Sequence, residues 1–232
     1  MQSRPLVVMD RHMDSTGASG NLQKGAKTRA SILDAAERLF SHRGYDGTSL
    51  RDLAGEADVR LGALHYHFGA KDQVLAAAID RRLGTLHDEI EASFAAARAG
   101  NRLSDVQDCV RAFIMPFLVI NADRSHPLHH FVVMTSHLMS SYRVPEVEPA
   151  IRRLSAITQI FITALCDIRA DVDTDRLLTG TYLIEAALIF MMQDPGFLDD
   201  LSEHHHSAEH LDRIADASLA FFSAGLSALI DR

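Results

Sequence analysis

Apolar side chains recur every three or four residues along most of this chain, and no segment alternates apolar and polar residues over the length of a strand. In the segment 71–99 one stripe of a helix consists of Leu75, Ile79, Leu83, Leu86 and Ile90. Further helices are predicted at about 104–121, 127–141, 146–167, 174–193 and 208–229, with turn-forming residues between them. The pattern predicts an all-α protein.

The chain has 232 residues, of which 47% are hydrophobic and 23% charged, as in ordinary globular proteins. Its longest uninterrupted apolar run, residues 112–120, is shorter than the roughly 18 residues of a membrane-spanning helix. Residues 6–9 are too short an apolar stretch for a secretion signal. We expect a cytoplasmic protein with no membrane partner. Cys109 and Cys166 lie far apart in the sequence and are predicted to be buried thiols.

Charge is unevenly distributed along the chain, whose formal net charge is -8. The first 75 residues contain ten Lys and Arg against nine Asp and Glu, whereas the rest contain 13 against 22. All three lysines, Lys24, Lys27 and Lys71, lie in the first part. Any contact with phosphates should therefore be made by the N-terminal third, because the acidic remainder would be repelled by DNA.

Three parts are predicted: a disordered tail over 1–26, a three-helix unit over 27–73 and a larger helical domain over 74–232. The tail has no apolar period. The first helix of the unit ends at Gly44, and Asp46-Gly47 forms a turn. Thr48 or Ser49 can cap a second, short helix, and a third segment runs from Val59 to Phe68. Such short helices bury their apolar faces only by packing crosswise on one another.

These residues carry a specific resemblance over about 50 positions, in order and in spacing. The matching runs are Thr28–Phe40 (TRASILDAAERLF), Gly44–Ala54 (GYDGTSLRDLA), Gly62–Phe68 (GALHYHF) and Lys71. They resemble the N-terminal helix-turn-helix domain of the TetR family of transcriptional regulators. The resemblance implies a homodimeric repressor with a DNA-binding head and an effector-binding body. It implies no cofactor, and no catalytic constellation stands out, so an enzyme is not expected.

The third helix of a helix-turn-helix unit enters the major groove, and flanking groups hold phosphates. The residues expected to be exposed on that helix are Arg60, Leu61, Ala63, His65 and Tyr66. The resemblance implies a phosphate clamp that consists of Thr48, Ser49, Tyr66, His67 and Lys71. Arg51, at the start of the second helix, is the best candidate for a bidentate contact with guanine.

Three departures from the family pattern make the operator sequence non-transferable. Asp58 replaces the usual turn glycine, although aspartate tolerates a left-handed backbone. Arg60 replaces a hydroxyl-bearing cap and Leu61 a polar residue, which weakens the helix start and turns an apolar group toward the bases, where it can meet a thymine methyl. His65 replaces the first aromatic residue of the family's usual run.

The body contains large, adaptable apolar residues of the kind that line pockets of variable shape, although a plain packed core gives the same pattern. An organic, mostly apolar effector is expected to be bound by Phe117, Phe131, Met134, His137 and Phe161. Binding of such an effector should change the separation of the two heads in a dimer and so release a palindromic operator.

The histidines suggest an alternative function, that of a metal- or pH-sensing regulator. His126, His130 and His137 fall on one face of a helix. A second group, residues 203–210, reads as a solvated connector that is rich in His and Glu. Neither group has a tight metal-ligand spacing, so no metal site is assigned.

Dimerisation is predicted through the last two helices, because the final helix has more apolar surface than one core face requires. Its stripe includes Leu211, Ala215, Ser218, Phe222 and Leu226, with Ile214 and Phe221 to the side. Pairing of this stripe with Leu178, Tyr182 and Ile189 of the preceding helix and their symmetry mates would give a four-helix bundle.

Overall fold

The computed structural model describes residues 15–100, 103–139, 141, 144–194, 196–205 and 211–231, without the side chains of 15–21 and 211–213. This part of the chain is helical and contains no strand. The helices are α1 (Ser15–Arg43), α2 (Leu50–Glu56), α3 (Leu61–Phe68), α4 (Lys71–Ala99), α5 (Val106–Ala122), α6 (His129–Met139), α7 (Glu148–Ile168), α8 (Thr174–Gln193), α9 (Phe197–Leu201) and α10 (Leu211–Ile230). Within the described residues, no helix is both long and apolar enough to cross a membrane.

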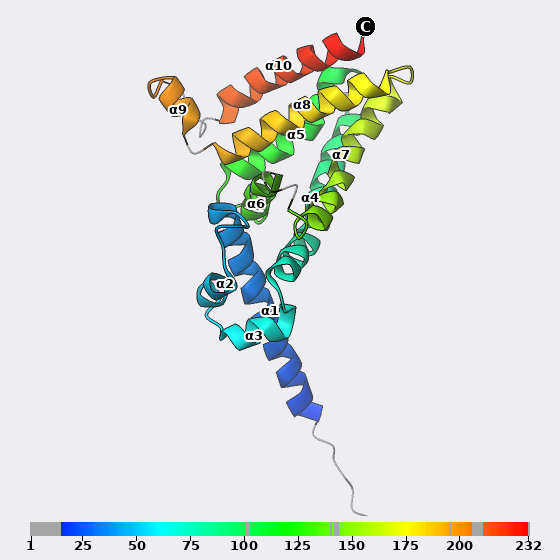
Figure 1. The fold of residues 1–232 in the computed structure, drawn as a ribbon. Helices are drawn as coiled ribbons and strands as arrows, with labels where there is room; N and C mark the ends of the chain where they lie inside the picture. Colours follow the sequence, from blue (N-terminus) through cyan, green and yellow to red (C-terminus); the bar gives the residue numbers. More distant parts are fainter. Residues whose placement is uncertain are drawn as a thin grey trace, which may run out of the picture.

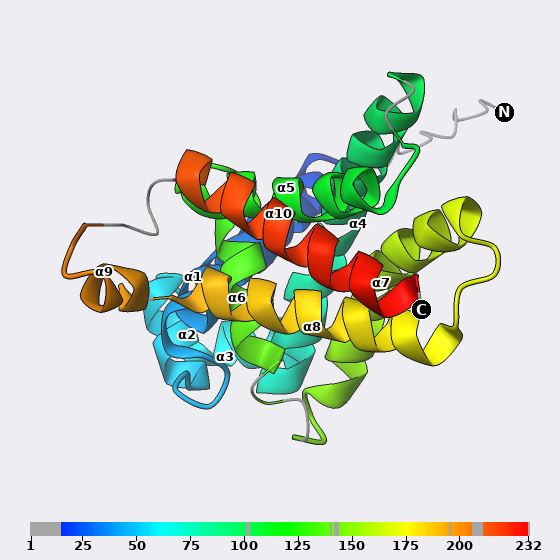
Figure 2. The ribbon, with the colours of Figure 1, turned by 90° about the horizontal axis from the view of Figure 1, so that it is seen from above.

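The molecule has a small head and a larger body, which α4 joins (Figure 1). In the head, α1, α2, α3 and the start of α4 bury a common core around Phe40, Leu53, Leu64 and Leu75. In the body, α5 and α6 lie beneath α8 and α10, which run side by side across the end opposite the head (Figures 1 and 2). The all-α prediction is confirmed.

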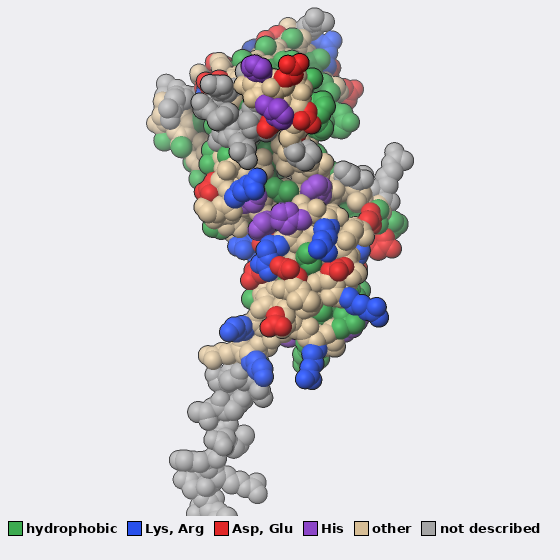
Figure 3. Space-filling view, turned by 90° about the vertical axis from the view of Figure 1, so that its left-hand side faces the viewer, with side chains coloured by type: hydrophobic (Ala, Val, Ile, Leu, Met, Phe, Trp, Pro, Cys, Tyr) green, Lys and Arg blue, Asp and Glu red, His purple; other side chains and the backbone are tan. Residues whose placement is uncertain are grey.

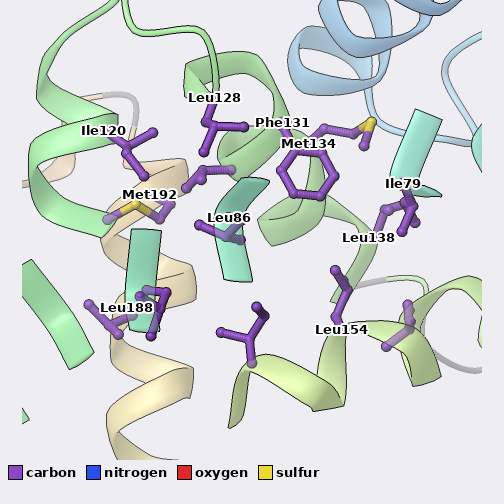
Figure 4. Packing of buried hydrophobic residues seen from close by; sticks show 14 of the residues in the cluster. Ile79, Leu86, Ile120, Leu128, Phe131, Met134, Leu138, Leu154, Leu188 and Met192 are labelled. Atoms are coloured by element: carbon purple, nitrogen blue, oxygen red, sulfur yellow. The ribbon is translucent and has the colours of Figure 1, made fainter. Parts of the chain in front are cut away.

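The core of the body includes side chains from the middle of α4. Leu86 of α4 lies among Leu154, Leu188 and Met192, which come from α7 and α8 (Figure 4). Deeper in the body the rings of Phe113 and Phe161 stack with their centroids 4.5 Å apart. These contacts make α4 a structural part of both the head and the body.

A buried ion cluster fastens α1 to α4. The Glu37 side chain on α1 is 5% exposed, and Arg81 and Arg82 on α4 donate to its carboxylate at 2.5 and 3.0 Å. Arg81 also donates to Asp34 on α1 at 2.8 Å. Since a buried carboxylate is costly without charged partners, this cluster fixes where α4 leaves the head.

Several boundaries differ from the sequence prediction. α1 begins at Ser15, so residues 15–26, expected to belong to a disordered tail, are helical. A helix that is nucleated by its packed later turns extends at little cost through residues with no apolar period. Residues 1–14 lie outside the described part. The short α9 went unpredicted, because five residues carry no helical period.

The two cysteines do not share an environment, and the prediction that both are buried is wrong for Cys166. Cys109 is buried, and burial raises the pKa of its thiol to about 12. Cys166 is exposed on α7. A small apolar side chain near the end of a helix is compatible with either face, so periodicity did not decide its burial.

Replacing Glu37 by alanine should lower the free energy of unfolding by about 3 kcal/mol, because two partly buried guanidinium groups lose their carboxylate. The control is Asp80→Ala, which removes the partner of Arg153 from a pair whose side chains are 60% and 44% exposed. That change should cost less than about 1 kcal/mol. Chemical denaturation followed by circular dichroism measures both, and equal losses would contradict the role given to Glu37.

Candidate nucleic-acid interface and effector cavity

A capping box fixes the start of α2. The Ser49 hydroxyl accepts from the Asp52 backbone N–H at 3.2 Å, and the Asp52 carboxylate accepts from the Ser49 N–H at 2.8 Å. The carboxylate also accepts from the Ser49 hydroxyl at 2.5 Å, and these bonds hold the pKa of Asp52 below its usual value. The predicted cap is therefore Ser49, and its hydroxyl proton is used within the head.

The turn between α2 and α3 is built as the sequence predicted. Asp58 has a φ of 53°, the left-handed conformation in which the family usually has glycine. The next N–H, that of Val59, returns to the Ala54 carbonyl at 2.9 Å. Arg60 stands at the N-cap of α3 and makes no side-chain capping bond, so the helix start lacks the support that a hydroxyl would give.

Besides Ser49, two members of the predicted phosphate clamp have internal partners. The Thr48 side chain is buried, and its hydroxyl donates to the Gly44 carbonyl at 2.9 Å, so it is not presented to a ligand. The Lys71 ammonium donates to the carbonyls of Tyr45 at 2.8 Å and Thr48 at 3.0 Å, and lies 4.0 Å from the Tyr45 ring centroid. Lys71 thus holds the loop before α2, and one of its three protons remains for a phosphate.

Other predicted DNA contacts lie on the open surface of α2 and α3. Arg51, Arg60 and His65 are exposed, and Tyr66 is 86% exposed, a large fraction for an aromatic side chain. Six predicted residues line one concave surface formed by the loop before α2, the two helices and the start of α4: Thr48, Ser49, Arg51, Leu61, His65 and Lys71. Ala63 and His67 are half-buried.

Sequence reasoning missed a basic surface on the early turns of α1. Lys24 and Lys27 are exposed on the early turns of α1. The N-terminal end of α1 extends past α3 (Figure 1). In the same region, a side chain at Gly25 would meet the His67 ring at 3.9 Å. Lys and Arg side chains spread over this lower end of the molecule (Figure 3). The sequence placed phosphate contacts in the N-terminal third, which holds both lysines, but Lys24 was assigned to the disordered tail and neither lysine was predicted as an individual DNA contact.

The body contains a cavity of about 440 Å³. Its lining comes from five helices and is mostly apolar: Leu86, Phe113, Phe117, Val132, Thr135, Ser136, Met139, Ile151, Arg152, Leu154, Ser155, Ile157, Thr158, Glu185, Leu188, Ile189 and Met192. A volume of this size accepts a drug-sized molecule.

Of the five predicted effector contacts, only Phe117 lines this cavity. Phe131 and Met134 are fully buried core residues of α6 (Figure 4). Phe161 stands behind the wall, where it stacks on Phe113. His137 lies on the opposite side of α6. The sequence pattern could not separate a cavity wall from a packed face, because both consist of apolar residues at helical spacing.

α6 separates the cavity from the head. Val132, Thr135, Ser136 and Met139 lie on its cavity face. On the opposite face, which packs on α1, the Ser41 hydroxyl and the His130 ring nitrogen Nδ1 are 3.2 Å apart. One helix therefore lines the cavity and packs on the first helix of the head.

Of the three histidines expected to share a metal- or proton-binding face, His130 and His137 both lie near Ser41 and His42 of α1, whereas His126 has a different partner. His126 lies 3.7 Å from Glu89 of α4, whereas His130 contacts Ser41 of α1. Burial lowers the pKa of His130 and of His137. Across the described ranges, no group of three His, Cys, Asp or Glu side chains is placed to hold a metal ion. Part of the second group, residues 206–210, lies outside these ranges.

The predicted dimer stripe of α10 packs instead on its own protomer. Ala215, Phe222 and Leu226 are at most 8% exposed, because α10 lies on α5 and α8. Ser218 is half-buried, Ile189 lines the cavity, and the Leu211 side chain lies outside the described residues. The large apolar side chains that remain exposed on the described residues of α8 and α10 are Leu178, Tyr182, Leu183, Phe190 and Phe221, so two of the predicted residues, Leu178 and Tyr182, are available to a partner.

Family comparisons agree with this geometry. A model of bacterial regulatory proteins of the tetR family matches residues 32–78, and a model of the tetracyclin repressor-like C-terminal domain matches residues 111–225. The chain belongs to the TetR family of transcriptional regulators. Members of this family are typically repressors that bind DNA, often as dimers, and bind small-molecule effectors.

Individual relatives match mainly in part of the chain. An HTH-type transcriptional repressor of Mycobacterium tuberculosis is 39% identical over 97 residues, which are 40% of this chain and 46% of the relative. The regulator TtgR of Pseudomonas putida is 35% identical over 95 residues, 40% of this chain and 42% of its own. The match thus spans less than half the length of these relatives.

Solved structures share the whole fold at low sequence identity. The fatty acid degradation regulator FadR of Bacillus halodurans has a TM-score of 0.60 at 17% identity, covering 86% of this chain and 96% of its own. FadR of Bacillus subtilis in complex with stearoyl-CoA has a TM-score of 0.51 at 15% identity, covering 84% and 98%.

Proposed function

We propose that this protein is a ligand-responsive repressor that binds a palindromic operator as a homodimer and leaves it when a small, mostly apolar effector fills the cavity of the body. The observation that carries the proposal is the position of α6, with Thr135 and Ser136 toward the cavity and His130 against Ser41 of α1. A ligand that repositions α6 acts on the head directly, because a packed helix moves as a unit.

The open face of α2 and α3 supports operator recognition. Arg51, Arg60 and Tyr66 are all exposed on this pair of helices, so guanidinium groups for guanine and phosphate and an aromatic group that DNA would cover are presented together. Leu61 adds an apolar contact for a thymine methyl, and Lys24 and Lys27 extend the positive surface along the DNA backbone.

Arg51→Ala should weaken binding to a duplex enriched by in vitro selection by about 1 to 3 kcal/mol, and should relax base preference at the position that Arg51 reads. Binding to a random duplex should weaken far less, since the remaining phosphate contacts are retained. Fluorescence anisotropy at two salt concentrations measures both affinities. The control is Arg111→Ala, an exposed arginine of α5, which should leave both unchanged. Equal losses on the two duplexes would remove Arg51 from base readout.

The exposed apolar surface of α8 and α10 supports dimerisation at the end opposite the head (Figure 2). Phe221 is 76% exposed, Tyr182 68% and Leu178 47%. Such residues gathered on two adjacent helices are typical of a surface that pairs with its two-fold copy. A dimer of this kind presents two α3 helices to successive major grooves if they lie about 34 Å apart.

Phe221→Glu should convert the dimer to a monomer at micromolar concentration, because it places two charges near the two-fold axis of an apolar interface. Sedimentation velocity measures the change. Tyr66→Glu, which alters an equally exposed aromatic residue at the far end of the molecule, should leave the dimer intact. A Phe221→Glu protein that sediments as the wild type does would place the interface elsewhere.

Ligands found by thermal-shift screening against the body should lower operator affinity by some 5- to 150-fold, the usual range of allosteric coupling. Linkage requires the operator to lower ligand affinity by the same factor. Calorimetry with and without the selected duplex measures this reciprocal effect. Ligands that bind the cavity and leave DNA affinity unchanged would contradict the proposed coupling.

A further inference from the structure

We propose that the cavity takes an amphipathic organic cation, whose apolar part lies on the aromatic wall and whose basic group pairs with Glu185. The inference rests on the proposed function in one respect, that this cavity is the effector site. It adds the chemical class of the effector, which Glu185 determines.

Glu185 places an acidic group in a mostly apolar cavity lining. It lies on α8 and lines the cavity together with Phe113 and Phe117 of α5, and burial raises the pKa of its carboxyl group. Charged side chains seldom line an apolar space without a partner, because removal of a carboxylate from water is costly. A basic group on a ligand would supply that partner.

The protein uses only part of the hydrogen-bonding capacity of this carboxyl group. The Thr158 hydroxyl of α7 donates to Oε1 at 2.5 Å. Among the residues that the structure describes, no basic side chain forms an ion pair with Glu185. A carboxylate has about four acceptor positions, so one hydroxyl leaves room for further donors. The Glu185 carboxylate can therefore accept a charge-assisted hydrogen bond from a ligand in the cavity.

The other charged residue in the lining, Arg152, is paired already. Its guanidinium donates to Glu148 on the same helix at 3.0 and 2.5 Å, and its side chain is 71% exposed. The positive charge lies toward solvent with a carboxylate beside it, whereas the negative charge lies inside. This asymmetry favours a cationic ligand over an anionic one such as a fatty acid.

The aromatic wall and the size of the cavity fit the same class. The rings of Phe113 and Phe117 meet edge to face at a centroid distance of 5.5 Å, and the π face of an aromatic ring attracts cations. The 440 Å³ volume accommodates an apolar body of drug-like size beside the head group.

Decylamine, decanol and decanoate, which share one apolar chain, separate the head-group classes. With each probe below its micelle-forming concentration, calorimetry on the wild-type dimer should give an affinity for decylamine about tenfold above that for decanol. Decanoate should bind more weakly than decanol. The affinity for decylamine should rise with pH through the range in which Glu185 ionises, because the cation binds the carboxylate form.

Glu185→Gln keeps the shape of the side chain and should abolish both the preference for decylamine over decanol and its pH dependence. Decanol affinity should remain within about twofold, since apolar contacts are retained. The matched control is Asp88→Asn on α4, where an 87% exposed carboxylate is removed outside the cavity. This variant should keep the full preference, so general attraction of cations to an acidic protein is separated from pairing with Glu185.

Three results would overturn the inference: tighter binding of decanoate than of decylamine, an undiminished cation preference in Glu185→Gln, or no binding of any probe. Operator affinity, measured in parallel, tests the proposed function separately. If decylamine binds through Glu185 and operator affinity does not change, the cation site stands and the coupling fails. If another ligand class releases DNA from the same cavity, the coupling stands and the cation site fails.

Discussion

The Glu37 carboxylate, enclosed between Arg81 and Arg82, sets the geometry on which the rest of the molecule depends. It joins α1 to α4 at the point where α4 leaves the head, so the direction of α4 is fixed by a buried charge contact. Such an ion pair restricts the positions of both helices, because displacement of a guanidinium group would leave a buried carboxylate without a partner, which is energetically costly. The head therefore moves with α1 and α4 as one body, and forces on either helix are transmitted to α2 and α3.

The second contact of α1 is the route by which we propose that the body acts on that head. α6 offers Thr135 and Ser136 to the cavity and His130 to Ser41 of α1, on opposite faces of a helix of eleven residues. A ligand shifts an equilibrium only by its differential affinity for two geometries. In the proposed mechanism the cavity, with α6 as one wall, supplies such a difference, because a ligand that needs more room than the empty cavity offers would move that wall.

Sequence reasoning predicted the fold and the surface of the head because the chemistry there is local. The Ser49 cap, the left-handed turn at Asp58 and the bounds of α4 follow from short-range rules. The sequence-based predictions failed where a side chain could lie on either of two faces of its segment. Phe131 and Met134 are core residues, Phe222 and Leu226 pack on their own protomer, and the Thr48 side chain is buried. Glu185 lacked a sequence signal, because its position beside Thr158 depends on how α7 and α8 pack.

The central claim is that ligand binding changes the separation of two heads in a dimer, and a distance between the heads tests it most directly. Gly55→Cys places a spin label on the exposed end of α2, where an added side chain meets no neighbour. Cys166→Ser removes the exposed native thiol, and Cys109 is buried with a pKa of about 12. Pulsed electron paramagnetic resonance should give one narrow distance with operator and a shifted or broader one with a cavity ligand. Identical distributions in the two states, with DNA released, would contradict the account.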